Sequence, residues 1–415
     1  MKQRALLVAV RKSRSAHSRG ARSQISDSLD ELQALAFTAG IEVLGREIQA
    51  RSETDPALFI GRGKADQLQQ HAQKAAVDLL IFDDELSPTQ QRNLERQTGC
   101  GVLDRTQLIL SLFAQRARTR EGKLQVELAQ LNYLRPRLTG RGVELSRLGG
   151  GIGTRGPGET KLETDRRRIV HRIARIRREM DHVRAQRQLQ RERRHETAVS
   201  TVSLVGYTNA GKSTLFNALT TASVPVAPQL FSTLDPTLRK LQLPSRRPAL
   251  LSDTVGFIRK LPHTLVTAFR ATLEEVVESD LILHVVDRSN PRFLEQEEAV
   301  EQVLEELNAR AKPILRVYNK VDLMDSEIAL KIKDTVAVSA LTGSGLERLL
   351  ERIDELLVRD PLIDCLFEFP LSEGGALSLI QRRGRLLDQR VVSGMLRVHA
   401  LLPQSVALKL QSFRL

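Results

Sequence analysis

Short apolar runs and amphipathic helical patterns alternate through the first hundred residues. The candidate strands are 5–10, 41–44 and 79–82, and the candidate helices are 26–38, 67–76 and 88–97. In the first helix, Leu29, Leu32 and Leu35 recur at three-residue steps, as expected for one buried helical face. Ser87 followed by Pro88 is a typical helix start, because serine caps the first N–H groups and proline suits the first turn. Residues 1–104 therefore predict a small α/β unit.

Residues 105–196 change to a long helical pattern. Helices are expected at 105–118, 121–134 and 164–196. One face of the second helix carries Leu124, Leu128, Leu131 and Leu134, and one face of the third carries Ile169, Ile173, Ile176, Met180 and Val183. Steps of three and four residues are typical of a two-helix seam, so this segment predicts an antiparallel helical arm.

Strand-like and helix-like stretches alternate again from residue 197 to about residue 358. This order predicts a mostly parallel sheet with helices on both faces. Residues 359–415 contain a helix-like stretch at 373–382 and a strand-like stretch at 391–401, which together predict a small α/β carboxy-terminal domain. The expected fold class is α/β, with an amino-terminal α/β unit, its helical arm, a central domain and this appendix.

Composition excludes several classes of protein. The chain has 41% hydrophobic and 27% charged residues, and no apolar run approaches the roughly 18 residues that span a bilayer, which argues against a transporter or channel. The opening M-K-Q-R and the short apolar run after it do not suit a signal peptide, so a cytoplasmic protein is expected. Cys100 and Cys365 are the only cysteines and lack metal-ligand spacing, which argues against zinc or a disulfide framework.

The positive charge is concentrated in the expected helical arm. The net charge is +13, and residues 105–196 carry 23 basic and 10 acidic side chains. The flanking segments are balanced, with 14 of each sign in 1–104 and 26 of each in 197–415. The arginines outside the seam of the last helix include Arg166, Arg167, Arg168, Arg172, Arg175, Arg177, Arg178, Arg184 and Arg187. Such an excess is typical of contact with a phosphate backbone, and a solvated helical face is the alternative.

A glycine-rich stretch within residues 140–163 separates the two arm helices. Six of the ten residues from Gly149 to Gly158 are glycine, which does not suit a core element, because ordering glycine costs entropy that no side chain offsets by packing. The flanking basic residues are Arg141, Arg147, Arg155 and Lys161. The bare backbone could approach structured RNA closely, and a flexible connector is the alternative.

The strongest chemical signal is the stretch G-Y-T-N-A-G-K-S-T at residues 206–214, which follows an apolar run at 201–205. It fits the phosphate-loop pattern G-x-x-x-x-G-K-[ST], in which backbone N–H groups point at nucleotide phosphates. Lys212 is expected to reach the β- and γ-phosphates, and Ser213 to offer its hydroxyl to Mg²⁺. The helix that opens at Lys212 turns its positive dipole end to the same anion.

Three further motifs follow in the order of a guanine-nucleotide site. Asp253 comes at the end of an expected strand and can hold the water shell of a metal, while Gly256 can offer its N–H to the γ-phosphate. The stretch N-K-V-D ends in Asp322, whose carboxylate can accept the two N–H donors of the guanine edge, a pair that adenine lacks. Ser339 and Ala340 would bring a backbone N–H to the guanine carbonyl. The sequence therefore predicts GTP and GDP as ligands, with Mg²⁺.

These motifs resemble those of the HflX family, within the Obg and HflX group of translation-associated GTPases. The most specific matches are G-G-G-I-G-T-R-G-P-G-E-T-K-L-E-T-D-R-R-R at 149–168 and K-L-Q-V-E-L-A-Q-L at 123–131, and F-S-T-L-D-P-T at 231–237 and D-T-V-G-F-I at 253–258 also match. The resemblance covers nearly the whole chain and implies a P-loop GTPase that hydrolyses GTP. It also implies docking on the large ribosomal subunit, with the arm and glycine loop toward the peptidyl-transferase region, and splitting of stalled or idle ribosomes.

The resemblance also implies roles for single residues. Thr233 aligns with the switch threonine that coordinates Mg²⁺, although Thr237 is near. Phe257 stands where many signalling GTPases have a water-orienting glutamine, so slow intrinsic turnover is expected, and Asn209 stands where similar GTPases bind K⁺. The expected catalytic residues are Lys212, Thr233 and Gly256, and the expected metal ligands are Ser213, Thr233 and Asp253. The residues expected to bind the nucleotide are Gly206, Tyr207, Thr208, Asn209, Ala210, Gly211, Lys212, Ser213, Thr214, Phe231, Thr233, Asp253, Gly256, Asn319, Lys320, Asp322, Ser339 and Ala340.

Several alternatives stay open at this point. The chain could be a GTPase that regulates RNA or proteins away from the ribosome, or a binding module whose nucleotide only stabilises the fold. Residues 61–64, G-R-G-K, suggest a second nucleotide site but lack the full phosphate-loop spacing. Residues 83–85, D-D-E, suggest either a metal site or a solvated turn. A monomer is expected, and peripheral attachment to a membrane is left open.

Overall fold

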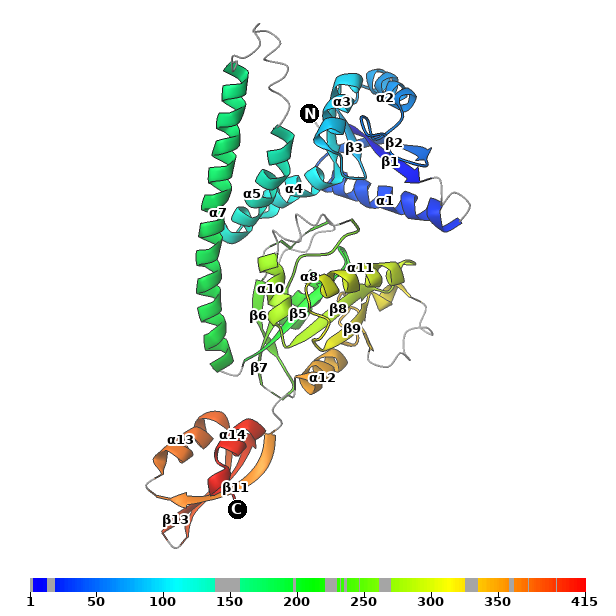
Figure 1. The fold of residues 1–415 in the computed structure, drawn as a ribbon. Coiled ribbons are helices and arrows are strands. Elements are labelled where there is room, and N and C mark those ends of the chain that lie inside the picture. The colour runs from blue at the N-terminus through cyan, green and yellow to red at the C-terminus, as the bar shows by residue number, and fades with distance from the viewer. Residues whose placement is uncertain are drawn as a thin grey trace. The chain divides into compact units, whose positions relative to one another are not determined.

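The computed structural model describes most of the chain, which is drawn as a ribbon in Figure 1. The described residues are 3–12, 19–138, 157–196, 199–220, 230–231, 233–234, 237–245, 247–260, 270–324, 335–357, 362–371, 373–392 and 394–415. The chain divides into two compact units, Met1–Leu349 and Leu350–Leu415. This division falls within helix α12, Leu346–Leu356, and thus before the expected boundary at residue 358. No described helix is both long enough and apolar enough to cross a membrane.

The amino-terminal segment forms a four-stranded parallel sheet in the order β2-β1-β3-β4. Its strands are β1 (Arg4–Lys12), β2 (Glu42–Arg51), β3 (Leu79–Phe82) and β4 (Gly101–Asp104), and its helices are α1 (Arg19–Thr38), α2 (Arg62–Ala75) and α3 (Pro88–Thr98). Successive β1 side chains face opposite sides of the sheet, so Leu7 joins one hydrophobic cluster and Val8 another. The predicted α/β unit is confirmed. The pattern did not predict β4, because two of its four residues are glycine and aspartate, which are depleted in strands.

The basic segment consists of helices α4 (Arg105–Arg116) and α5 (Arg120–Leu134), the 3₁₀ turn η2 (Arg135–Leu138) and helix α7 (Pro157–Glu196). Two ion pairs show that α5 and α7 run antiparallel. Near the start of α5, Arg120 meets Glu179 at 3.4 Å, and further along α5, Glu127 meets the earlier α7 residue Arg172 at 2.6 Å. The predicted antiparallel packing of these two helices is confirmed.

The buried seam between these helices is shorter than the sequence predicts. Leu124, Ile176 and Met180 form its centre, with Leu128 and Leu131 packed partly buried against them. Leu134 was expected in the seam but is 42% exposed. Helix α7 begins at Pro157 instead of the expected Thr164, because proline suits a first helical turn and the residues that follow Gly158 favour a helix. Residues 139–156, which hold most of the glycine-rich stretch, lie outside the described residues.

A six-stranded sheet in the order β10-β9-β8-β5-β7-β6 forms the central segment. Its strands are β5 (Ser200–Gly206), β6 (Thr237–Gln242), β7 (Pro248–Asp253), β8 (Leu281–Asp287), β9 (Ile314–Asn319) and β10 (Thr335–Ala337). The described helices of this segment are α8 (Lys212–Thr220), α10 (Arg270–Glu278), α11 (Phe293–Glu306), the 3₁₀ turn η3 (Val321–Leu323) and α12. All pairs are parallel except β6 with β7. Every residue of β8 is buried, as expected for a parallel strand covered on both faces.

The carboxy-terminal unit holds a three-stranded antiparallel sheet in the order β11-β13-β12. Its elements are β11 (Leu362–Pro370), α13 (Gly374–Arg383), β12 (Arg385–Val392), β13 (Met395–Pro403), α14 (Gln404–Lys409) and the 3₁₀ turn η4 (Gln411–Phe413). Phe367, Val398 and Ile380 are fully buried in its own hydrophobic core. The expected small α/β appendix is confirmed.

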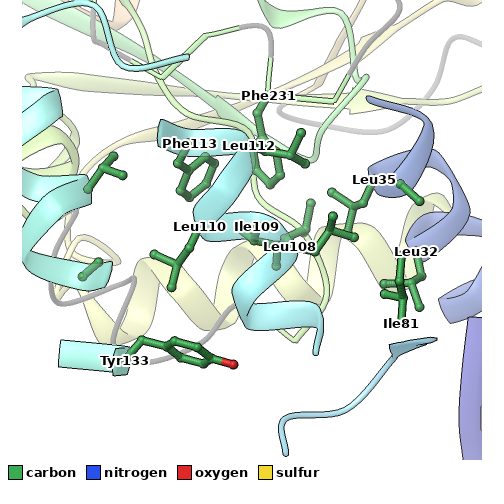
Figure 2. Packing of buried hydrophobic residues seen from close by; sticks show 14 of the residues in the cluster. Leu32, Leu35, Ile81, Leu108, Ile109, Leu110, Leu112, Phe113, Tyr133 and Phe231 are labelled. Carbon is green, nitrogen blue, oxygen red and sulfur yellow. The ribbon is translucent and has the colours of Figure 1, made fainter. Parts of the chain in front are cut away.

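One hydrophobic cluster joins the amino-terminal sheet to the central segment (Figure 2). Helices α1, α4 and α5 contribute leucine, isoleucine, phenylalanine and tyrosine side chains, while the central segment contributes Phe231, Leu234, Val255 and Ile258. Full burial of one such side chain stabilises the fold by roughly 1.5–3 kcal/mol. Helix α4, which sequence analysis placed in the arm, is thus largely a core helix, since its apolar residues from Leu108 onward lie in this cluster.

Candidate functional site

The phosphate-loop stretch connects the end of β5 at Gly206 to the start of α8 at Lys212. Gly211 has a φ of +90°, and a Cβ atom there would lie 2.2 Å from Asn319 Nδ2, so this position requires glycine. Asn319 Nδ2 donates to the Ala210 carbonyl at 2.9 Å. The N-K-V-D stretch at the end of β9 is thereby attached to the phosphate loop.

Lys212 is buried beside this loop. Its Nζ donates to the carbonyl oxygens of Gly206 and Tyr207, at 3.0 and 2.9 Å. Burial lowers the pKa of Lys212 to about 8, and the neighbouring Asp253 carboxylate acts in the opposite direction. A Cβ atom on Gly256 would lie 2.8 Å from Thr208 Cγ2 and 3.1 Å from Lys212 Nζ, so a glycine suits this close approach. The structure therefore brings Lys212 and Gly256 together, as the motifs predict.

Three oxygen-bearing side chains meet where a metal is expected. Ser213 Oγ lies 2.9 Å from Thr233 Oγ1, and each hydroxyl donates to Asp253 Oδ2 at 2.8 Å. All three residues are buried. Thr237 lies in β6 and pairs with Asp253 through the backbone ladder, so the geometry favours Thr233 over Thr237 as the switch threonine.

The same residues have the chemistry that Mg²⁺ requires. Burial raises the pKa of Asp253, an effect that Lys212 and the Ser213 and Thr233 hydroxyls oppose. The second carboxylate oxygen, Asp253 Oδ1, is buried and has no hydrogen-bond partner among the described residues. A buried carboxylate oxygen without a partner is costly, and a cation or its bound water would satisfy it. Hydroxyl and carboxylate oxygens are the ligands that Mg²⁺ prefers, so the residues fit this ion.

The expected guanine-binding residues meet at the ends of β9 and β10. Asn319 Oδ1 accepts the Ala340 backbone N–H at 3.0 Å, which joins the two motifs. Lys320 has a φ of +63°, and its Nζ pairs with Asp287 Oδ2 at 2.7 Å. Ser339 is fully buried, whereas Asp322 in η3 is exposed. The exposed Asp322 carboxylate can therefore accept hydrogen bonds from the edge of a purine base.

Three aromatic residues of the nucleotide motifs turn away from the site. Phe231 was expected to bind the nucleotide, but its side chain packs in the hydrophobic cluster against Phe113 and is 2% exposed. The Tyr207 hydroxyl donates to Glu31 at 2.6 Å, so only the backbone of Tyr207 can face a phosphate. Phe257 is 2% exposed and packs in the core under β5 and β8. Its backbone carbonyl accepts the Thr208 N–H at 2.7 Å.

A buried ionic network beside the phosphate loop escaped the sequence analysis. Arg105 donates to Glu31 and Asp83 at 2.5 and 2.9 Å and to the backbone carbonyl of Arg259 at 3.1 Å. Lys260 Nζ lies 2.6 Å from Asp83 Oδ2. Although burial acts to raise the pKa of Asp83, Arg105 and Lys260 hold it below its ordinary value. The charged residues of this network lie far apart in the sequence and follow no recognisable spacing, so the sequence did not predict it.

The structure also decides the two minor motifs. The described residues contain no group of three or more histidine, cysteine or acidic side chains that could hold a metal. At 83–85, Asp83 is buried in ion pairs whereas Glu85 is exposed, so the solvated-turn prediction holds for Glu85 but not for Asp83. At 61–64, the Gly61 N–H donates to Gln49 at 2.9 Å, and Lys64 pairs with Glu47 at 2.7 Å. Protein side chains therefore take the positions that a phosphate would need there.

The expected basic face of α7 is partly neutralised within the arm. Arg172 donates two hydrogen bonds to Glu127, at 2.6 and 2.7 Å, and Arg175 donates to Glu179 at 3.1 Å. The exposed arginines of the helix include Arg166, Arg167, Arg168, Arg175, Arg177 and Arg178. Positive charge therefore remains at the surface of α7.

Three family models match successive parts of the chain. The model described as GTP-binding GTPase N-terminal matches residues 26–114, and GTP-binding GTPase Middle Region matches residues 116–194. The model described as 50S ribosome-binding GTPase matches residues 201–320. The last match contains the phosphate loop, the D-T-V-G motif and the start of the N-K-V-D stretch.

Curated relatives agree with these matches, and the chain is also similar to a solved structure. A protein called GTPase HflX from Caldanaerobacter subterraneus subsp. tengcongensis is 48% identical over 388 residues, which cover 94% of this chain and 88% of the relative. GTPase HflX from Escherichia coli (strain K12) is 48% identical over 337 residues, 80% of this chain and 79% of the relative. A GTP-binding protein from the hyperthermophilic archaeon Sulfolobus solfataricus, solved with GDP, is 26% identical with a TM-score of 0.43, covering 86% of this chain and 99% of that chain.

Proposed function

Because the chain belongs to the HflX family of GTPases, we propose that it binds the large ribosomal subunit and splits stalled or idle ribosomes, and that GTP hydrolysis drives its release. The chain is a P-loop GTPase that binds guanine nucleotide and hydrolyses GTP to GDP and phosphate. The ribosomal partner and the splitting activity are the proposed part. A cytoplasmic location and a monomeric state belong to the same proposal.

The site residues have separate roles in the proposed reaction. Lys212 binds the β- and γ-phosphates, and the Gly256 N–H binds the γ-phosphate as negative charge shifts during transfer to water. The hydroxyls of Ser213 and Thr233 would hold Mg²⁺, with Asp253 binding its water shell. The ion would neutralise charge between the two terminal phosphates.

A group outside these motifs must position the attacking water. Phe257 is buried in the core and has no polar atom on its side chain, so it cannot orient water. We therefore expect slow turnover in the isolated protein and faster turnover when a bound partner completes the site. Asn209 is exposed in the loop with a φ of +62°, and a turnover that needs K⁺ instead of Na⁺ would assign a potassium contact to it.

The observation that carries the ribosomal proposal is the exposed positive charge along α7. The segment 105–196 holds an excess of 13 basic side chains, and arginines such as Arg177 and Arg178 are exposed. Guanidinium groups bind phosphate in a planar, two-donor geometry, so this surface suits RNA. The family model described as 50S ribosome-binding GTPase points to the same kind of partner.

Co-sedimentation with purified large subunits tests the proposal. We expect the protein to sediment with the subunit in the presence of a non-hydrolysable GTP analogue, and less with GDP. Changing Arg177→Glu and Arg178→Glu together should weaken binding and lower the log–log salt slope by roughly 1.4 to 1.8, since each phosphate contact contributes about 0.7 to 0.9. The matched control is Arg239→Glu with Lys240→Glu, two exposed basic residues of β6 outside the arm.

The outcome of this experiment separates two functions. If the protein ignores ribosomal subunits but binds free RNA with the same salt slope, it is a GTP-dependent RNA-binding regulator that acts away from the ribosome. If neither RNA nor subunits bind, the exposed arginines form a solvated face and the proposal is wrong. If the protein does bind large subunits, a decrease in the amount of associated ribosomes when the protein and GTP are added would establish splitting.

A further inference from the structure

Phe231 and Thr233 are two residues apart, yet their side chains lie in opposite environments. The Phe231 ring packs edge-to-face against Phe113 of α4, with ring centroids 4.6 Å apart and planes at 77° (Figure 2). The Thr233 hydroxyl instead bonds to Asp253 and Ser213. One short segment therefore links the hydrophobic cluster to the metal-binding oxygens.

The backbone of this segment is held in an unusual conformation. Phe231 has a φ of +57°, in the left-handed region that a bulky side chain adopts when its surroundings require it. Those surroundings are the cluster, in which Phe231 is 2% exposed. Leu234, the residue after Thr233, is buried in the same cluster at 3%. Thr233 is thus held between two buried anchors, and their packing decides where its hydroxyl lies.

The cluster also holds the segment that follows Asp253. Val255 and Ile258 are buried in it alongside Phe231. The two stretches that would contact the γ-phosphate and its metal therefore share one hydrophobic cluster with the apolar residues of α4. A displacement of α4 would disturb the packing of both stretches.

We propose that Phe231 is a positioning residue for the GTPase reaction, whose packing against Phe113 holds the Thr233 hydroxyl at Asp253 and Ser213 in readiness for magnesium-bound GTP. The proposal rests on the proposed role of Thr233 as a metal ligand. It also connects the site to the arm, because α4 is followed within three residues by α5, which packs against α7. Contact of the arm with a partner would reach Thr233 through Phe113 and Phe231.

Equilibrium nucleotide binding by the full-length protein tests this role without a turnover measurement. Phe231→Ala and Phe113→Ala should each weaken binding of a non-hydrolysable GTP analogue in Mg²⁺ by about tenfold. The affinity for GDP should change less than about threefold, because GDP has no γ-phosphate and its binding depends less on Thr233. The double variant should bind the analogue no more weakly than the single variant with the lower affinity, because both changes remove the same contact between Phe113 and Phe231. Phe231→Leu, which keeps an apolar anchor, should restore most of the analogue binding.

Phe59→Ala is the matched control. Phe59 also has a positive φ, +67°, is 8% exposed and packs edge-to-face on a second phenylalanine, Phe82, but it lies in the cluster on the other face of the amino-terminal sheet. If Phe59→Ala weakens analogue binding as much as Phe231→Ala does, the effect is general destabilisation and the proposal is wrong. Equal losses for GDP and the analogue would also overturn it.

Two further outcomes keep this test separate from the ribosomal one. If Phe231→Ala does not fold, Phe113→Ala carries the test, and an unchanged preference for the analogue over GDP in that variant would count against the proposal. Thr233→Ala should weaken the Mg²⁺-dependent binding of the analogue at least as much as Phe231→Ala does, and unchanged binding in that variant removes the premise. None of these measurements contains a ribosome, so a negative co-sedimentation result leaves them unaffected.

Discussion

The hydroxyl of Tyr207 in the phosphate loop donates a 2.6 Å hydrogen bond to the carboxylate of Glu31 in α1, a residue 176 positions away. The same hydroxyl accepts the backbone N–H of Arg259 at 2.8 Å. Arg105 binds Glu31 from the other side at 2.5 Å. The phosphate loop, the stretch after the D-T-V-G motif and the amino-terminal unit are thus joined through one phenol group.

Replacing Tyr207 by phenylalanine should destabilise this junction without changing the phosphate-binding backbone. The variant leaves the half-buried Arg259 N–H without its Tyr207 partner, which costs about 1–3 kcal/mol or less. We expect a lower midpoint of chemical unfolding and near-normal GDP affinity. Tyr133→Phe is the control, because the hydrogen bond from its hydroxyl to Gln107 is long, at 3.4 Å, and its loss should matter less. A loss of GDP affinity greater than the loss of stability would show that the phenol itself shapes the nucleotide site.

Asp322→Asn should change the preferred base without unfolding the protein. Asp322 is exposed in η3, so its replacement leaves the core intact. The carboxylate accepts two N–H donors from guanine, whereas an amide presents a donor to one of them and suits the extra carbonyl of xanthine. Competition between GTP and xanthosine triphosphate should shift toward the latter by at least about tenfold. An unchanged preference for guanine would show that Asp322 does not read the base.

Phe257 should affect stability far more than catalysis. Its side chain lies in the core with Val205, Leu273 and Val276, so Phe257→Ala should cost about 3–5 kcal/mol in unfolding free energy. Phe257→Leu preserves most of the volume and should keep the slow intrinsic turnover of the folded protein. A catalytic group would instead cost on the order of a hundredfold or more. Such a loss in Phe257→Leu with normal nucleotide affinity would assign the residue a role in the reaction.

His284 should make stability depend on pH below neutrality. The residue is 1% exposed in β8, and burial lowers its pKa to about 4, with Arg316 and Lys212 acting in the same direction and Glu301 opposing them. The neutral form is favoured in the fold, so its stabilising effect is complete above pH ~6.5 and is lost as pH falls toward 4. A shift of about 2.5 units corresponds to roughly 3 kcal/mol.

Chemical unfolding of the wild type and of His284→Gln measures this effect, because glutamine has no proton to gain in this range. The difference in unfolding free energy between the two proteins should shrink by roughly 3 kcal/mol from pH 7 to pH 4. A difference that stays constant over this range would mean that His284 is protonated in the folded protein or does not titrate there.

Local patterns were sufficient to predict much of this protein. The phosphate loop follows from residues 206–214 alone, because its geometry is built from adjacent backbone groups whose spacing is visible in the sequence. The same holds for the start of α3, where Ser87 caps the helix as expected, and the structure adds a reciprocal hydrogen bond from Gln90. Helical periodicity likewise predicted the antiparallel contact of α5 with α7, since both faces repeat at three- and four-residue steps.

Only the tertiary structure decided which of those residues face the nucleotide and which face the core. The F-S-T-L-D-P-T match led to the assignment of Phe231 to the nucleotide, but the cluster around α4 buries its ring. It left Asp83 as a metal ligand or a solvated residue, and the fold places it between Arg105 and Lys260, the latter 177 positions away. Such contacts depend on burial and charge pairing between distant segments, which no local window of sequence contains. The short motifs therefore determined the chemistry of the site, and long-range packing determined how α4 and the amino-terminal unit hold it.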